Sequence, residues 1–237
     1  MSSSDPLRER FAATAARLGE LEERRREALR LELQRFLQPR GDELVLDSGT
    51  GTGALAFALA PLVREVVAID IVPELLDEAR RRSADFPNVR FIEGDATRLE
   101  LDAGSFDLAG SLRTLHHVAR PELAMAELAR VTRPGGQVLI VDQIASVDPL
   151  TALELNRFER ARDPSTTRVL AEVDLRGLFE ANGLVLERAQ TVQEPRELET
   201  YLDLAGCEGD ARAAALVLAP PGYEATVGWY LLRKPGL

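Results

Sequence analysis

The stretch that decides the fold is Leu44-Val45-Leu46-Asp47-Ser48-Gly49-Thr50-Gly51-Thr52-Gly53. A short apolar run ends in a carboxylate, and three glycines at alternate positions follow it. Glycine lets the backbone turn sharply and approach a ligand without a side chain in the way. The helix predicted over residues 52–62 would point its free N–H groups at the same ligand. This stretch therefore predicts a strand, a ligand-binding loop and a helix in succession.

The same alternation of strand and helix continues along the chain. Further strands are predicted over residues 66–70, 89–93, 106–109 and 137–141, with helices over 73–83 and 121–131. The strands are continuous apolar runs, which is typical of a parallel sheet buried on both faces. Strands alternating with helices predict a doubly wound, Rossmann-like α/β fold with three layers, helices on both sides of the sheet.

The two flanks of this region have weaker patterns. A long helix is predicted over residues 5–37, and Pro39 and Gly41 end it. After residue 142 we predict helices over 148–162, 172–181, 197–204 and 211–218. A sixth strand begins near Val185, and a last strand covers residues 226–232.

Composition and charge exclude several classes of protein. The 237 residues include 29 basic and 39 acidic ones, a net charge of −10, which disfavours nucleic acid as a partner. We read the Arg-rich stretch 24–30 as a solvated helix face, because glutamates are interleaved with its arginines. No apolar run is long enough to span a membrane, and the first ten residues lack a signal region. Cys207 is the only cysteine, and we expect a cytoplasmic protein without a metal site.

Three acidic residues follow three successive strands: Asp47, Asp70 and Asp95. One such residue could be a simple capping carboxylate. In an open parallel sheet, however, ligands bind outside the carboxyl ends of the strands, so three carboxylates at those ends predict a shared site. Asp70 could accept hydrogen bonds from two ribose hydroxyls, Asp95 from an adenine amine, and Asp47 from the amino group of a methionine moiety.

These features resemble the class I S-adenosylmethionine-dependent methyltransferases, particularly the group with the quinone-biosynthesis C-methylases. The resemblance covers about residues 40–145. It is carried by the glycine-rich stretch and four further segments, Ala68-Ile69-Asp70, Glu93-Gly94-Asp95-Ala96, Ser105-Phe106-Asp107-Leu108 and Arg130-Val131-Thr132-Arg133-Pro134-Gly135-Gly136. It implies S-adenosylmethionine as cofactor and a transfer of its methyl group to a small-molecule acceptor.

The resemblance also implies which residues bind the cofactor. They are Asp47, Ser48, Gly49, Thr50, Gly51, Gly53, Asp70, Ile71, Asp95, Ala96, Ser111 and Leu112. The glycines would shape the methionine pocket, and Ile71 would pack on the adenine. The backbone N–H of Ala96 would read the adenine edge. Ser111 and Leu112, expected just after the fourth strand, would approach the sulfonium.

The family fold implies a domain arrangement as well. The sheet would have seven strands, with the last one antiparallel and inserted beside the sixth. Residues 1–40 would form a helical lid over the cofactor, and residues 41–237 the methyltransferase domain. Within that domain, residues 41–145 would bind the cofactor and residues 143–182 would form part of the substrate wall. The long first helix would also suit a homodimer contact.

Candidate catalytic residues are few. Methyl transfer from a sulfonium needs mainly proximity and alignment, and a base only where the acceptor carries a proton. His116 and His117 are the only histidines, and we predict that His116 faces the substrate as a base. The alternative is that the pair bonds the next helix or the sheet edge. Arg157, Arg162 and Asp163 are predicted to cluster, either anchoring an anionic substrate group or locking a turn.

Two other functions remain open on sequence alone. Residues 51–56 can be read as the G-x-G-x-x-A fingerprint of a nicotinamide-dependent oxidoreductase, with Asp70 on the ribose. That scheme gives Asp47 and Asp95 no role, and no catalytic Tyr-x-x-x-Lys pair is evident. A non-catalytic subunit that binds the cofactor is the other alternative. A nucleic-acid methyltransferase is disfavoured, because Gly110-Ser111-Leu112-Arg113 lacks the proline and aromatic residues of that class.

Overall fold

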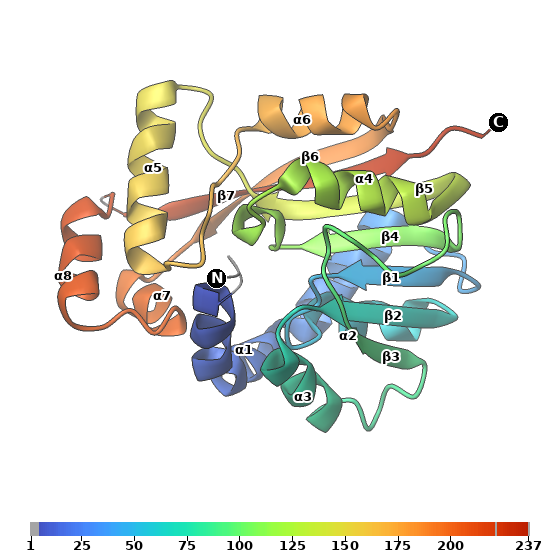
Figure 1. The fold of residues 1–237 in the computed structure, drawn as a ribbon, viewed down its shortest axis with the longest axis horizontal. Coiled ribbons are helices and arrows are strands. Elements are labelled where there is room, and N and C mark those ends of the chain that lie inside the picture. Colours follow the sequence, from blue (N-terminus) through green and yellow to red (C-terminus); the bar gives the residue numbers. More distant parts are fainter. Residues whose placement is uncertain (1–4, 221, 237) are drawn as a thin grey trace.

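A single mixed sheet organises the protein (Figure 1). The computed structural model describes residues 5–220 and 222–236. The strand order is β3-β2-β1-β4-β5-β7-β6. The strands are β1 (Leu44–Ser48), β2 (Glu65–Asp70), β3 (Val89–Glu93), β4 (Phe106–Leu112), β5 (Thr132–Gln143), β6 (Val185–Pro195) and β7 (Glu224–Arg233). β7 is antiparallel to both of its neighbours, β5 and β6, so the predicted seven-stranded arrangement is confirmed.

Helices connect and cover these strands. They are α1 (Asp5–Leu37), α2 (Ala54–Leu59), α3 (Pro73–Arg81), α4 (Pro121–Val131), α5 (Pro149–Arg162), α6 (Glu172–Ala181), α7 (Leu198–Leu204) and α8 (Gly209–Leu218). Two short 3-10 helices cover Ala60–Leu62 and Leu115–His117. None of the helices in residues 5–220 has the length and apolarity that a membrane crossing requires.

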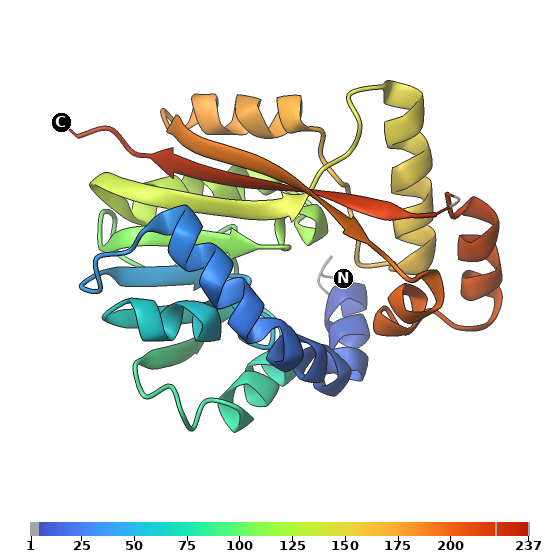
Figure 2. The ribbon, with the colours of Figure 1, turned by 180° about the vertical axis from the view of Figure 1, so that it is seen from behind.

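The three predicted layers are present, and strand alternation explains them. Val45 and Leu139 face one side of the sheet, where they pack with α1 and α2. Leu46 and Ile140, the next residue in each strand, face the other side and pack with α4 and α6. Figure 2 shows α1 running across the back of the sheet. Because both faces are covered, each central strand is apolar at nearly every position, which is the pattern that the sequence presented.

Two strand boundaries differ from the prediction. Ser111 and Leu112 are the last two residues of β4, where they pair with Ile140 and Val141, and do not lie after the strand. β5 begins at Thr132, so the Pro-Gly-Gly stretch that we expected to precede the strand lies within it. A register shift between Phe106 and Leu108 accommodates these residues, because the β4–β5 pairing continues on both sides of the irregularity.

A small helical unit extends the sheet at one end. α5, α7 and α8 share their own apolar cluster, in which Phe158, Leu202 and Ala215 are fully buried. The segment 143–182 that we predicted as a substrate wall is therefore divided. Its α5 belongs to this unit, whereas its α6 packs on the sheet through Leu175 and Phe179. Figure 1 shows α5, α7 and α8 together beside the carboxyl ends of the strands.

Candidate active site

One large cavity lies outside the carboxyl ends of β1, β2 and β4. Its volume is about 910 Å³, and Asp47, Asp70 and Asp95 all line it. α1 forms one wall, the segment after β4 a second, and α5 with the loops around α7 a third. The three strand-end carboxylates are thus gathered around a common cleft.

Asp47 is the most buried of these acids, with no exposed surface. Its Oδ2 accepts hydrogen bonds from Thr50 Oγ1 at 2.6 Å and from the Ala56 N–H at 3.0 Å. Its Oδ1 has no hydrogen-bond partner among the described residues. Burial raises the pKa of Asp47 to about 7 against the effect of those two donors. A buried acceptor without a partner points to a donor that comes from outside the chain.

The glycine-rich loop is held in place by its neighbours. Gly49 has a φ of 76°, and a Cβ there would lie 2.2 Å from the Thr114 Cγ2. The Thr114 hydroxyl donates to the Gly49 carbonyl at 3.0 Å. The Gly51 N–H donates to Asp70 Oδ2 at 2.7 Å, which joins the loop to the end of β2. Only glycine fits position 49, because both the backbone angle and the space exclude a side chain.

Asp70 and Asp95 lie along the same wall. Asp70 also accepts the Val72 N–H at 2.9 Å on its Oδ1, so both of its oxygens have backbone donors. Asp95 Oδ1 accepts the N–H and the hydroxyl of Thr97 at 2.8 and 2.7 Å, and this residue is exposed at the rim. Each carboxylate oxygen has two lone pairs, so both residues can still accept a ligand hydroxyl or amine.

The other residues expected to bind the cofactor divide into two groups. The cavity wall includes Gly49, Thr50, Gly51, Ile71, Ala96 and Leu112. It does not include Ser48, Gly53 or Ser111. Ser48 and Ser111 are buried inside strands, and Gly53, with a φ of 96°, begins α2 against the Phe57 ring.

His116 faces the cavity with one ring nitrogen held by a carboxylate. Its Nδ1 lies 2.5 Å from Asp142 Oδ1, at the end of β5, and its side chain is 11% exposed. Burial lowers the pKa of His116, but the neighbouring Asp142 raises it more, so the net direction is upward. This contact is neither a bond to the next helix nor one to the sheet edge, because Asp142 lies near the end of β5, an interior strand of the sheet.

His117 stands in a different environment. Its Nδ1 lies 3.0 Å from Ser165 Oγ, and Ser165 in turn bonds Asp163. Asp163 forms an ion pair with Arg10 of α1 at 2.6 Å, and both side chains are buried. Burial and the adjacent His116 place the pKa of His117 well below its usual value. The two histidines, whose ring centroids are 4.0 Å apart, are therefore biased toward opposite protonation states.

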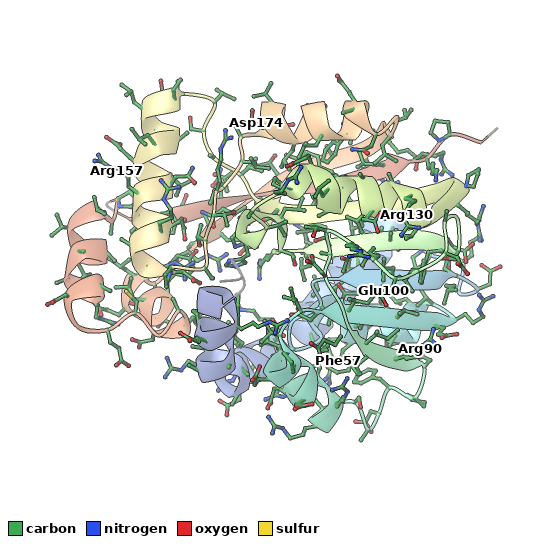
Figure 3. All side chains as sticks on the ribbon, viewed as in Figure 1. Phe57, Arg90, Glu100, Arg130, Arg157 and Asp174 are labelled. Carbon is green, nitrogen blue, oxygen red and sulfur yellow. The ribbon has the colours of Figure 1, made fainter. Side chains whose placement is uncertain are left out.

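The predicted cluster of Arg157, Arg162 and Asp163 is only partly present. Arg157 is exposed on the outer side of α5 and does not belong to it (Figure 3). Glu159, two residues further along α5, lies on the opposite side of the helix and is buried, as is Phe158. Arg162 is buried, bonds Glu159 at 3.0 Å and lies 3.9 Å from Asp163. Arg162 and Asp163 both line the cavity, so the residues that stabilise this turn also form part of the cavity wall.

Known proteins share this fold and these motifs. The sequence profile of a methyltransferase domain family matches residues 46–140. The uncharacterized methyltransferase YcgJ of Bacillus subtilis is 31% identical over 173 residues, which cover 72% of this chain and 68% of that protein. Its crystal structure superposes with a TM-score of 0.81 at 25% identity, over 88% of this chain and 98% of that one.

The chain belongs to the class I S-adenosylmethionine-dependent methyltransferases. A demethylmenaquinone methyltransferase of Clavibacter sepedonicus is a further relative, 33% identical over 142 residues. That match covers 60% of this chain and 58% of the relative's length. Membership of the family excludes the nicotinamide-dependent oxidoreductase that residues 51–56 allowed.

The site of this methyltransferase fits its cofactor. The unpartnered Asp47 Oδ1 is a buried acceptor of the kind that an ammonium group needs, and the backbone at Gly51 has no neighbouring atom within 4 Å of a Cβ position. The cavity therefore offers both a charge partner and room for close approach at the same loop.

Several wall residues of the methyltransferase were not identified from the sequence. Glu22 of α1 bonds the hydroxyl of Thr52, and burial raises the pKa of Glu22 to about 7. Asp142 and Arg10 were also missed, although each contacts a residue of the site. Asp142 directly follows the apolar run of β5, so the rule that found the other strand-end acids could have found it. Glu22 and Arg10 lie on a charged helix, where no spacing separates them from the surrounding acids and bases.

Proposed function

We propose that this methyltransferase acts on a small molecule that binds in the same cavity as the cofactor. The observation that carries the proposal is the continuity of the cavity, which runs from the glycine-rich loop past His116 to Tyr201. Its volume of about 910 Å³ lies at the upper end of the roughly 300–1,000 Å³ of ligand pockets, which suits a cofactor with a small acceptor. The chain's own helices form its walls, which favours a small molecule over a macromolecular surface.

The cofactor residues that we propose occupy one end of this cavity. Asp47 would accept the ammonium group, Asp70 the ribose hydroxyls, and Asp95 with the Ala96 N–H the adenine edge. Ile71 would pack on the ring, and the loop from Gly49 to Gly51 would surround the methionine. When bound, S-adenosylmethionine supplies a methyl carbon activated by a positive sulfur. The residues of the chain then need to align the acceptor and exclude water.

His116 is the base that we propose. Asp142 holds its Nδ1, so the neutral ring keeps its proton there and leaves Nε2 free to accept one from an acceptor O–H or N–H. Because Asp142 outweighs burial and raises the pKa of His116, the ring also binds an accepted proton more firmly. His117 is the less suitable base, since burial and its neighbour keep it from becoming charged.

Replacing His116 by Asn tests this assignment. We expect turnover of a proton-bearing acceptor to fall about 10²–10⁴-fold, while binding of S-adenosylhomocysteine stays within about twofold. The measurement is transfer of a labelled methyl group to a panel of phenols, amines, thiols and carboxylic acids, beside calorimetric titration of the product cofactor. The matched control is His117→Asn. Full turnover in the His116 variant would remove the base, and methylation of macromolecules alone would overturn the small-molecule proposal.

A further inference from the structure

Three arginines from distant parts of the chain meet at the mouth of the cavity. Arg25 comes from α1, Arg113 directly follows β4, and Arg196 directly follows β6. The protein as a whole carries a net charge of −10, and Glu194 is the acid that pairs with two of these three arginines. Cations at the mouth of a cleft raise the local concentration of anions.

A single carboxylate serves two of these arginines. The Arg113 guanidinium donates to both oxygens of Glu194, at 2.7 and 2.9 Å. Arg196 donates to the same Glu194 at 2.5 Å. Arg113 also has a φ of 53°, in the left-handed region that residues other than glycine seldom adopt. Residues held in that region cluster at ligand sites, where the surroundings impose the conformation.

The remaining donors of the cluster have no acceptor in the part of the chain that the structure describes. Arg196 Nε is buried without a hydrogen-bond partner. Arg25 is an exposed residue and forms no ion pair there. Partial burial of its guanidinium lowers the pKa of Arg25, and repulsion from Arg113 and Arg196 lowers it further. Glu22 and Glu32 line the same part of the cavity and accept from Thr52 and Gln190, and neither forms an ion pair with Arg25 among the described residues.

We propose that the methyl acceptor carries an anionic group, a carboxylate or a phosphate, which binds between Arg25, Arg113 and Arg196. This inference rests on the proposed function, because it names the class of its substrate. An anion there would meet the buried Arg196 Nε–H and the unpaired Arg25 in a charge-assisted, forked geometry that suits planar oxyanions.

The position of Arg196 favours the acceptor over the cofactor's own carboxylate. Its guanidinium lies 5.3 Å from the centre of the Tyr201 ring, and Arg162 lies 4.0 Å from the same ring. Tyr201 and Arg162 belong to the helical unit of α5, α7 and α8, on the side of the cavity away from the Asp70–Asp95 wall. Arg196 therefore lies at the acceptor end, whereas Arg25 and Arg113 adjoin Glu22 and Thr114, which bond the glycine-rich loop. The anion site thus lies where the acceptor end meets that loop.

The first arm of the test concerns the cofactor. We would measure S-adenosylhomocysteine affinity for the wild type, for the double variant Arg25→Gln/Arg196→Gln and for the control Arg24→Gln, whose side chain is 77% exposed. We expect equal affinities within about twofold, because the proposal assigns both arginines to the acceptor. A loss of about tenfold or more in the double variant would assign the cluster to the cofactor's carboxylate and overturn the proposal.

The second arm concerns the acceptor and uses matched probes. Protein saturated with S-adenosylhomocysteine is titrated with benzoate against benzamide, acetate against acetamide, and inorganic phosphate, with the fluorescence of Trp229, the only tryptophan and a cavity residue, as readout. We expect at least one anion to bind about tenfold more tightly than its neutral partner, and the preference to vanish in the double variant.

The outcomes separate this inference from the proposed function. Wild-type protein that binds S-adenosylhomocysteine but shows no preference for any anionic probe overturns the anionic acceptor alone. Wild-type protein that fails to bind the product cofactor overturns the proposed function as well. A preference that persists in the double variant would place the anion elsewhere in the cavity and overturn the assignment to Arg25 and Arg196.

Discussion

Asp47 shows what a single residue contributes to this site. Its side chain lies at the end of β1 without solvent contact, and the protein supplies hydrogen bonds to only one of its oxygens. A buried acceptor without a donor costs about 1–3 kcal/mol, and more when it is charged. A cationic ligand would remove that cost, so relief of the unpaired acceptor would contribute to the binding free energy.

Replacing Asp47 by Asn tests that role. We expect the affinity for S-adenosylhomocysteine to fall about 10–100-fold, since a hydrogen bond to a charged group contributes about 1.5–3 kcal/mol. The measurement is calorimetric titration at pH 8. The control is Asp77→Asn, at an exposed acid that pairs with Arg80 on α3. Equal affinities for both variants would remove Asp47 from the binding site.

Alanine substitutions at Gly49 and Gly51 allow the cost of a steric clash to be distinguished from the cost of backbone strain. Alanine at position 49 would bring its Cβ to 2.2 Å from the Thr114 side chain at a φ of 76°, whereas position 51 has a φ of 58° and open space. We expect Gly51→Ala to lower the free energy of unfolding by about 1–2 kcal/mol through strain alone. Gly49→Ala should cost about 2–5 kcal/mol, because overpacking is added. Urea denaturation measures both, and equal losses would contradict the predicted clash.

At the scale of elements, α1 connects the two halves of the cavity. Leu33 and Phe36 near its end pack on the sheet, Ala15 packs on α3, and Arg10 near its start pairs with Asp163 after α5. We propose that α1 is the lid over the cofactor, and Figure 2 shows its course from the carboxyl ends of the parallel strands to the opposite end of the sheet. The ion pair then fixes the lid to the acceptor end of the site.

Replacing Arg10 by Met tests this connection. Asp163 would lose its close partner and keep only Arg162 at 3.9 Å, and removing one member of a buried ion pair costs about 3–5 kcal/mol. We expect faster amide hydrogen exchange in the first turns of α1 and after α5, together with a lower free energy of unfolding. Adding Asp163→Asn should restore much of the loss, because the buried charge that lost its close partner is removed. Arg24→Met on the exposed face is the control, and identical exchange in Arg10→Met would contradict the link.

The order of the helices and strands could be predicted from the sequence, whereas two strand boundaries could not. The order and the type of the strands followed from apolar runs, because burial on both faces leaves a clear pattern. The end of β4 and the start of β5 did not, since Ser111 and the Pro-Gly-Gly stretch look like loop residues. Ser111 is in a strand because it pairs with Ile140, and Gly135 and Gly136 exchange backbone hydrogen bonds with Lys234. Contacts such as Arg10 with Asp163 join residues that are far apart in sequence, and local spacing carries no trace of them.

At the scale of the whole molecule, the site is built from two parts of the sequence, the family motifs and the segments that flank them. Residues 46–140, which match the family profile, supply the glycine-rich loop and the strand-end acids. Most of the opposite wall comes from α1 and from residues after 143, where Arg25, Arg162 and Arg196 lie. The motifs therefore identified the cofactor, whereas the acceptor depends on how the flanking segments fold back over the sheet.

Proton binding and cofactor binding are linked in the whole molecule. Burial raises the pKa of Asp47 from 3.8 to about 7, and that of Glu22 from 4.5 to about 7. Between these values the folded protein binds more protons than the unfolded chain does, so both groups lower the free energy of unfolding as the pH rises from about 4 to 7. A cationic ligand beside Asp47 favours its ionised form and reverses this trend.

We therefore expect the affinity for S-adenosylhomocysteine to rise about tenfold between pH 6 and pH 8, as Asp47 loses its proton. At a fixed ligand concentration well above the Kd, the stabilisation that the ligand adds should be about 1.4 kcal/mol larger at pH 8 than at pH 6. Urea denaturation with and without the ligand at both pH values measures the difference. In Asp47→Asn the stabilisation by the ligand should depend much less on pH. The remaining pH dependence would come from Glu22, and the variant Glu22→Gln measures that contribution. Equal stabilisation by the ligand at pH 6 and pH 8 in the wild type would contradict the prediction, because it would mean that Asp47 is already ionised at pH 6.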